Sequence, residues 1–262
     1  MNIGFIGCGN MATAIIKGII SNSNIKGSDI LVFDTSKPAM DKLENAYGVS
    51  PCVNIEFLVC NSDVVFLAVK PNVLADVLNQ VETADALIIS IAAGKTLEFL
   101  ENNIKSKVAK IVRVMPNINA TVGEAICAYC YNKFVTDNDI ETVEMLLSCF
   151  GKCLHINEEL FSIYSAIGGC APAFAYMFID NLARAGVKNG MKKEDALKIA
   201  AQTVYGSAKM ILENDEHPWK LVDNVCSPGG TTIEGVASLQ ADGFEAAVQN
   251  AVQKAFEKDK KL

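Results

Sequence analysis

A glycine-rich segment near the amino terminus has residue types and spacing that could bind a phosphate-bearing ligand. Gly7, Gly9 and Ala12 follow a short apolar run and open a stretch with helical periodicity, which is the G-x-G-x-x-G/A pattern in the setting that dinucleotide binding requires. Gly7 permits a tight turn, Gly9 lets the backbone approach a pyrophosphate, and free N–H groups at the helix start attract negative charge. The alternative is a glycine turn needed only for packing. The predicted cofactor contacts here are Ile6, Gly7, Cys8, Gly9, Asn10 and Met11.

An acidic residue ends the second predicted strand. Asp34 stands about where a carboxylate accepts hydrogen bonds from an adenosine ribose and repels a 2′-phosphate, which favours NAD. Thr35, Ser36 and Lys37 follow at once and could bind that phosphate instead. Asp34 could also cap the next helix. The sequence therefore leaves NAD and NADP both open.

Two further loops are expected at the carboxyl ends of strands, where open α/β sheets bind ligands. The first contains Ala68, Val69, Lys70 and Pro71. Lys70 could be a general acid, although a surface lysine beside a loop is the commoner case. The second loop, 90–94, includes the small residues Ala92 and Ala93, which would let a nicotinamide lie close to the backbone.

The segment 227–232 has a composition suited to an anion. Pro228, Gly229 and Gly230 break one helix, and Thr231 and Thr232 begin the next. Free N–H groups and hydroxyls would then converge on one small volume, as in a carboxylate site. The alternative is an ordinary capped helix start.

The elements around these segments change character along the chain. Residues 1–156 alternate short apolar strands with helices, which indicates a mostly parallel sheet covered on both faces. Residues 157–262 contain no convincing strand and read as helices. We therefore predict an α/β chain with a Rossmann-like dinucleotide-binding domain at 1–156 and an all-helical domain at 157–262. Strands are predicted at 2–6, 30–33, 64–69, 87–91, 111–114, 125–131 and 152–156, and helices at 11–21, 37–47, 73–80, 97–103, 137–150, 158–186, 193–213, 219–225, 231–240 and 244–258.

One helical segment in the second half, residues 171–179, is apolar nearly all round. Such a helix must be buried on every side. Packing against a second copy of the chain achieves this burial most simply, so we expect an obligate homodimer formed by the helical domain. The alternative is a central helix within one subunit's bundle.

Composition restricts the classes of partner and the compartment. The 262 residues are 50% apolar, carry a net charge of −7 and include two arginines, so nucleic-acid and anionic-membrane surfaces are not expected. The amino terminus shows no targeting signal, the apolar runs look too short to span a membrane, and nine scattered cysteines fit a reducing cytoplasm.

Four of the cysteines have spacings that resemble a zinc site: Cys127, Cys130, Cys149 and Cys153. However, positions three apart on a strand, such as Cys127 and Cys130, face opposite sides. We expect no metal.

With these motifs in view, the chain resembles the pyrroline-5-carboxylate reductase family over nearly its whole length. The resemblance rests on four segments, of which the last is the most specific: GFIGCGNM at 4–11, AVKP at 68–71, RVMPN at 113–117 and SPGGTTI at 227–233. It implies reduction of Δ1-pyrroline-5-carboxylate to L-proline, usually with NADPH, by interlocked homodimers that often form larger rings.

The resemblance also implies residue roles. The substrate carboxylate would bind the backbone around Gly230, Thr231 and Thr232, and Thr232 would hydrogen-bond the ring nitrogen. Glu158 would be an acid of the substrate pocket. Asn224 would contact the cofactor, and Asn54 its adenosine end.

The chain departs from the family in three places. Gly168-Gly169-Cys170-Ala171 replaces Ser-Gly-Ser-Gly, Asn117-Ile118-Asn119 replaces Asn-Thr-Pro, and Asp34 replaces a small polar residue. These changes keep open a diverged paralogue that acts on another cyclic imine.

No ionisable pair stands near the predicted substrate turn. A protonated imine is already electrophilic, so positioning of the two reactants could supply most of the rate. Two rival classes remain. A β-hydroxyacid dehydrogenase needs a catalytic lysine on an early helix of its second domain, where Lys188 stands at a predicted helix end. The other rival is a non-catalytic dinucleotide-binding regulator or assembly protein.

Overall fold

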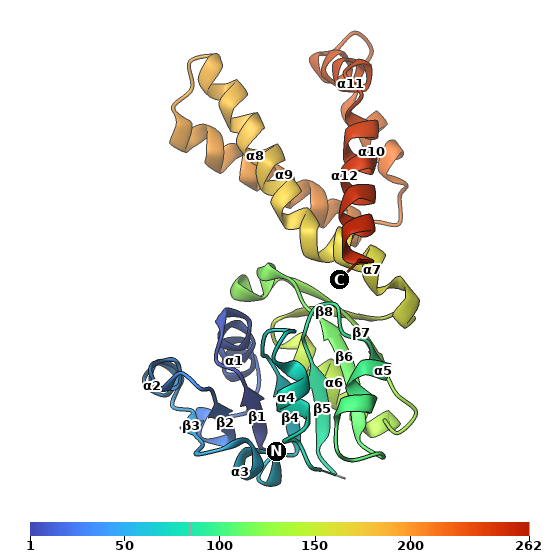
Figure 1. Cartoon of the computed structure of the whole chain (residues 1–262). Helices are drawn as coiled ribbons and strands as arrows, with labels where there is room; N and C mark the ends of the chain where they lie inside the picture. Colours follow the sequence, from blue (N-terminus) through green and yellow to red (C-terminus); the bar gives the residue numbers. More distant parts are fainter. Residues whose placement is uncertain (84, 262) are drawn as a thin grey trace. The chain divides into compact units, whose positions relative to one another are not determined.

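The computed structural model describes residues 1–83 and 85–261, which divide into two compact units (Figure 1). The first unit is Met1–Gly169 together with the residues from Lys258 onward, and the second is Cys170–Glu257. The first unit contains all the strands of the described residues, and the second is helical. The predicted α/β class, with a Rossmann-like half followed by an all-helical half, is confirmed.

One eight-stranded sheet runs through the first unit in the order β3-β2-β1-β4-β5-β6-β7-β8. Every neighbouring pair is parallel except β6 and β7. The chain order reverses beside β1, because β2 pairs with one side of it and β4 with the other. Such a switch point is where ligands of open α/β sheets bind. The strands are β1 Ile3–Ile6, β2 Ile30–Phe33, β3 Ser50–Pro51, β4 Val64–Leu67, β5 Leu87–Ser90, β6 Lys110–Met115, β7 Ala125–Tyr131 and β8 Gly151–His155.

Helices cover both faces of this sheet because alternate strand residues bury their side chains on opposite sides. Phe5 and Phe66, on neighbouring strands, stack at 4.7 Å on the face that α1 and α6 cover. Ile6 and Leu67, the next residues along, join the core beneath α3, α4 and α5. The helices of this unit are α1 Asn10–Asn22, α2 Lys37–Tyr47, α3 Ile55–Cys60, α4 Leu74–Leu78, α5 Leu97–Asn103, α6 Asp137–Ser148 and α7 Phe161–Tyr164, with shorter turns η1 Gly27–Asp29, η2 Ile118–Val122, η3 Glu158–Leu160 and the π-helical η4 Ser165–Cys170.

Among the strands and α-helices, two short elements were not predicted, β3 and α3. β3 has two residues, and α3 has six, so neither is long enough to display a hydrophobic period. The strand β3 exists because β2 offers it a parallel edge, with Leu31 paired to Ser50.

The helix predicted at 158–186 is confirmed as one continuous helical stretch, but it is not a regular α-helix throughout. The chain there forms η3, α7, η4 and α8 in succession. Pro172 at the start of α8 has no N–H to donate to the preceding turn, and a wider π-helical turn replaces the regular one. Phe161 is buried, and the Tyr164 hydroxyl lies 3.0 Å and 2.7 Å from the carbonyl oxygens of Met115 and Ile126. These contacts explain why the first unit extends through Gly169, whereas the domain boundary after residue 156 stays a prediction.

The second unit is built around a close helical hairpin. Its helices are α8 Ala171–Lys188, α9 Lys193–Glu213, α10 Pro218–Val225, α11 Thr231–Ala241 and α12 Phe244–Asp259. Ala183, Ala196 and Ala200 form a small core between α8 and α9. A Cβ atom on Gly186 would lie 3.1 Å from that of Ala196, so small residues allow the two helices to approach closely.

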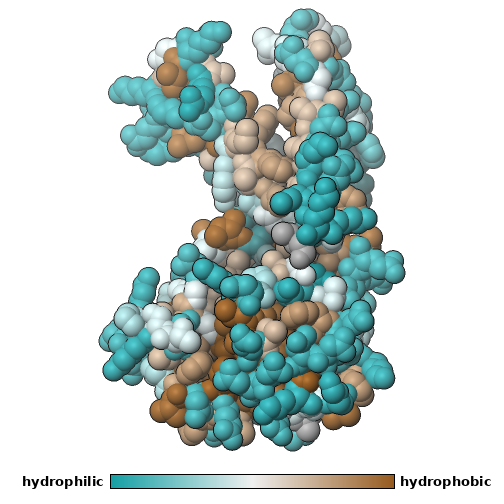
Figure 2. Space-filling view, viewed as in Figure 1, coloured by the Kyte–Doolittle hydropathy of each residue, from teal (hydrophilic) through white to brown (hydrophobic). Residues whose placement is uncertain are grey.

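The stretch 158–188 corrects the expectation that the apolar runs of this sequence are too short to span a membrane. Within the part of the chain described, Glu158–Lys188 is long and apolar enough to cross a membrane by length and composition, although only 17% of its most apolar window is buried. Tyr176, Met177 and Leu182 on α8 are among the large side chains left exposed in the single chain. The tan and brown surface along the helices in Figure 2 includes apolar side chains of this kind.

Candidate active site

The turn between β1 and α1 has the geometry that the glycine pattern predicts. Gly7 has φ of +105°, and a Cβ atom there would lie 2.5 Å from the carbonyl oxygen of Ala68. Its N–H donates to the carbonyl oxygen of Phe33 at 2.8 Å. Only glycine permits both this backbone conformation and this approach of β1 to the loop after β4.

The start of α1 is left open for a ligand. Gly9 is the N-cap residue and supplies no side-chain cap, and a Cβ atom built on it would meet nothing within 4 Å. Ala12 is buried at 1% exposure and packs the helix against the sheet. The first N–H groups of α1 therefore face empty space that suits a pyrophosphate.

A cleft of about 550 Å³ lies at the switch point beside this turn. Seven predicted cofactor residues line it: Ile6, Gly7, Gly9, Asp34, Ala68, Val69 and Lys70. Seven residues that the sequence argument missed also line it: Phe33, Ile55, Asn72, Val73, Asp76, Val77 and Gln80. Val73 and Val77 stand four residues apart across the start of α4, a spacing that marks one helix face. Two valines four residues apart, shortly after Lys70-Pro71, form the sequence pattern that could have identified Val73 and Val77 as cleft residues.

The Asp34 carboxylate connects the two loops at the rim of the cleft. Its Oδ2 accepts a hydrogen bond from the Cys8 N–H at 2.8 Å, and its Oδ1 accepts one from the Ser36 N–H at 2.8 Å. The helix that follows has Ser36 as its N-cap residue. The alternative in which Asp34 caps that helix is therefore wrong, because Asp34 stands two residues before the cap.

Cys8 is not suited to nucleophilic chemistry. Burial, together with the neighbouring Asp34 carboxylate, raises the pKa of its thiol to about 12. The neutral thiol is a poor nucleophile at neutral pH.

Cys127 and Cys130 lie on opposite faces of β7, as predicted for two positions three apart on a strand. Their side chains belong to different core clusters.

The remaining predicted cofactor residues occupy nearby loops and helix ends. Asn54 is the N-cap residue of α3, and its Oδ1 accepts from the Phe57 N–H at 2.8 Å. Ala92 is buried, whereas Ala93 and Pro71 are exposed. Ala92 and Ala93 directly follow β5, the strand beside β4. Asn10 and Met11 form the first turn of α1.

Glu158 takes part in a partly buried ionic cluster that the sequence did not predict. Its Oε1 accepts from Arg113 Nη1 at 2.8 Å and from the Leu97 N–H at 2.7 Å. The Arg113 guanidinium also lies over the Phe161 ring, 4.2 Å from the ring centre. Arg113 lies in the second half of β6, and Leu97 begins α5 after the Ala92–Ala93 loop. The cluster therefore ties that loop to the segment leading into the helical half.

The predicted substrate turn lies in the second unit, whereas Glu158 lies in the first. Gly229 has φ of +66°, and Gly230 is the N-cap residue of α11 without a side-chain cap. A Cβ atom on Gly230 would lie 2.4 Å from Ser227 Oγ. Thr231 is exposed and Thr232 is half-buried. Asn224, on α10, donates to Glu216 Oε2 at 3.3 Å.

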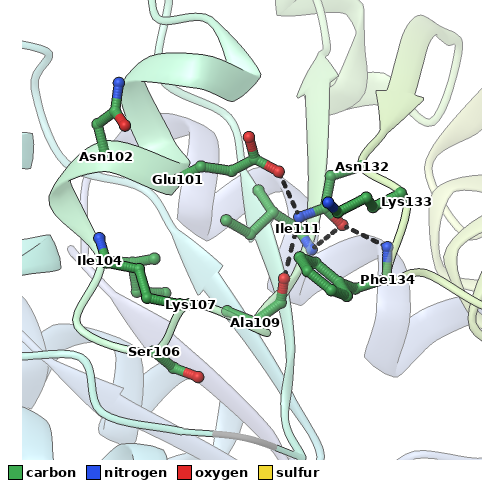
Figure 3. Close-up of a pocket in the computed structure, with 10 residues that line it drawn as sticks. All are labelled: Glu101, Asn102, Ile104, Ser106, Lys107, Ala109, Ile111, Asn132, Lys133 and Phe134. Carbon is green, nitrogen blue, oxygen red and sulfur yellow. Dashed lines mark hydrogen bonds between the residues drawn. The ribbon is translucent and has the colours of Figure 1, made fainter.

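A smaller cavity of about 190 Å³ lies near the amino-terminal end of β6 (Figure 3). The buried Asn132 amide organises its wall. Its Oδ1 accepts from the N–H groups of Ile111 and Phe134, and its Nδ2 donates to Glu101 and to the carbonyl oxygen of Ala109. These four bonds use the amide fully, so this cavity reads as a structural feature rather than a ligand site.

Asn132→Ala is expected to lower the free energy of unfolding by roughly 1–3 kcal/mol, because buried backbone groups lose their partners. Asn102→Ala is the matched control, since Asn102 lines the same cavity but is exposed. Urea unfolding at equal protein concentration measures both variants. Equal unfolding midpoints for the two variants would show that the Asn132 bonds contribute little.

Comparison with known proteins identifies relatives for both halves of the chain. A family model described as "Pyrroline-5-carboxylate reductase dimerisation" matches residues 158–262, and one described as "NADP oxidoreductase coenzyme F420-dependent" matches residues 2–94. The pyrroline-5-carboxylate reductase of Escherichia coli is 40% identical, covering 99% of this chain and 97% of its own length.

Solved structures of two reductases have the same fold as this chain over nearly its whole length. A pyrroline carboxylate reductase from Plasmodium falciparum with NADP bound is 36% identical with a TM-score of 0.89, covering 100% of this chain and 97% of its own. The pyrroline-5-carboxylate reductase of Coxiella burnetii is 30% identical with a TM-score of 0.92, covering 99% and 97%.

The fold, the open start of α1 and the cleft at the switch point define a Rossmann-type dinucleotide-binding chain, and the two family models add an NADP oxidoreductase half and a helical dimerisation half. The helical half and the full-length relatives then specify the group within that class. The chain belongs to the pyrroline-5-carboxylate reductase family.

Proposed function

We propose that this protein reduces the C=N bond of Δ1-pyrroline-5-carboxylate to give L-proline, the last step of proline biosynthesis. The observation that carries the proposal is the pairing, in one chain, of the uncapped glycine turn at Gly7–Gly9 with the uncapped helix start at Gly230–Thr232. The first suits a dinucleotide pyrophosphate, and the second suits a small carboxylate.

The dinucleotide end of the site would use the predicted contacts in a consistent way. The N–H groups of Asn10 and Met11 would face the pyrophosphate. The loops at Ala68–Pro71 and Ala92–Ala93, after adjacent strands, would hold the nicotinamide half, and Asn54 the adenosine end. Asn224 would add a contact from the helical half. NADPH, the usual donor in this family, supplies the hydride when it is bound.

At the substrate end, the backbone of Gly230, Thr231 and Thr232 would hold the carboxylate. Thr232 would hydrogen-bond the ring nitrogen and so act as the catalytic polar partner. Glu158 would border the substrate pocket while Arg113 and the Leu97 N–H fix its orientation. Solvent or the protonated imine itself would provide the proton. Holding the reactants at near-attack distance can then contribute roughly 7–11 kcal/mol without an ionisable catalyst.

The helical half of the chain would also form the interface between subunits. A homodimer, and from dimers a larger ring, would cover the exposed apolar side chains of α8, which include Met177 and Leu182. The family model for dimerisation matches residues 158–262. This match supports an interface role for Glu158–Lys188, the stretch that is long and apolar enough to cross a membrane. We accordingly propose a cytoplasmic enzyme with a small-molecule substrate, without nucleic-acid or membrane partners.

Thr232→Ala is expected to lower turnover roughly ten- to a hundredfold while NADPH binding survives, because one hydrogen bond to a charged or developing group is lost. Ser238→Ala, an exposed change on the same helix, is the matched control. Steady-state kinetics measure turnover, and fluorescence titration measures NADPH binding. Unchanged turnover in Thr232→Ala would remove Thr232 from the mechanism.

The activity itself is tested by following oxidation of NADPH and of NADH with pyrroline-5-carboxylate as the substrate. A β-hydroxyacid instead of the imine tests the dehydrogenase alternative, for which Lys188 is the last residue of α8 rather than an early one. Cofactor binding without turnover of either substrate would instead favour a regulator.

A further inference from the structure

The Asp34 carboxylate is fixed at the rim of the cofactor cleft. Its two hydrogen bonds, from the N–H groups of Cys8 and Ser36, come from the loops that follow β1 and β2. These strands are paired in register, with Ile6 opposite Phe33. Asp34 therefore stands directly beside the pyrophosphate turn, and its charge cannot swing out to solvent without breaking both bonds.

This position matters for the ribose nearest the adenine. When the pyrophosphate occupies the start of α1, that ribose falls at the end of β2. Each carboxylate oxygen of Asp34 has a second lone pair beyond the one already engaged. The carboxylate can thus accept hydrogen bonds from a free ribose diol while keeping both of its backbone partners.

The local charge disfavours a 2′-phosphate at the same place. Among the described acids that line the cleft, Asp34 is the one bonded to the pyrophosphate turn, whereas Asp76 lies on α4 and the cation Lys70 lies in the loop before that helix. The Ser36 N–H, which could have bonded a phosphate oxygen, already donates to Asp34. A dianionic phosphate beside Asp34 would meet a fixed like charge and lose one backbone donor.

We propose that Asp34 determines the dinucleotide specificity of this chain: it binds the ribose diol of NADH and weakens NADPH, so that NADH is an efficient hydride donor beside NADPH. The inference rests on the proposed function for its kinetic readout, but not for its binding readout. It concerns the residue at which this chain departs from the small polar residue of its family.

The test compares wild type, Asp34→Ser, Asp34→Asn and the control Asp76→Ser, which removes another acid of the same cleft. Each full-length protein is assayed with NADPH and with NADH, and its dissociation constants for NADP⁺ and NAD⁺ are measured by titration. Asp34→Ser is expected to raise the NADPH-to-NADH ratio of kcat/KM roughly ten- to a hundredfold, mainly through KM. Asp34→Asn keeps one acceptor and the side-chain size, so it should shift the ratio in the same direction if the serine variant is unstable.

Asp76→Ser should leave the ratio within about twofold, because its carboxylate has no bond to the pyrophosphate turn. An unchanged ratio in a folded Asp34→Asn protein would overturn the inference, as would an equal shift in Asp76→Ser. If no variant has reductase activity but the NADP⁺-to-NAD⁺ affinity ratio shifts as expected, the proposed function fails and the role of Asp34 stands. Reductase activity with an unshifted affinity ratio would support the proposed function and overturn the role of Asp34.

Discussion

Arg113→Met is expected to lower the free energy of unfolding by roughly 1–3 kcal/mol, because it removes one partner of a partly buried ion pair. The Arg113 side chain is 9% exposed and the Glu158 side chain 30% exposed, so the remaining carboxylate is only partly solvated. Methionine retains much of the packing of the arginine stem on Phe161. The loss should therefore report the charge and its hydrogen bond rather than a cavity.

A double-mutant cycle separates the pair from its surroundings. Glu158→Gln alone leaves Arg113 buried without a charged partner, although glutamine can still accept from the Leu97 N–H. Combining both changes should recover most of the stability, since no uncompensated charge remains. Urea unfolding is measured at one protein concentration, because assembly contributes to apparent stability. Additive losses in the double variant would show that the two side chains are not coupled.

Gly7→Ala is expected to weaken dinucleotide binding at least tenfold and to lower the melting temperature. The new Cβ atom would lie 2.5 Å from the Ala68 carbonyl oxygen, and φ of +105° is strained for alanine. A strained backbone conformation costs on the order of 1–3 kcal/mol. The turn must move away from the loop after β4, which displaces the N–H groups at the start of α1.

Gly9→Ala provides the contrast that makes this result interpretable. Its Cβ atom meets nothing within 4 Å, and φ is −75°, so the empty protein should keep its melting temperature. The methyl group would nevertheless enter the space proposed for the pyrophosphate, and binding should fall. NADPH fluorescence titration and thermal unfolding measure the two effects. Normal binding in Gly9→Ala would place the phosphates elsewhere.

The helical half shows how local patterns mislead when neighbouring segments decide the structure. The apolar periodicity of 158–186 predicts one α-helix, yet its pitch changes from 3₁₀ to α to π before the regular helix that contains Pro172 begins. Similarly, β3 forms only because β2 presents an edge. Hydrophobic period reports which face of a segment is buried, but not what interrupts its hydrogen bonds.

The sequence by itself determined the alternation of strands and helices, the glycine turn at Gly7–Gly9 and the family, because these depend on residue type and short-range spacing. Only the tertiary structure decided that Arg113 pairs with Glu158 across 45 positions and that the Asp34 carboxylate accepts a hydrogen bond from the Cys8 N–H. Each of these contacts joins segments that belong to or follow different strands. Sheet order and strand register bring such segments together, and neither can be read from the spacing of residues along the chain.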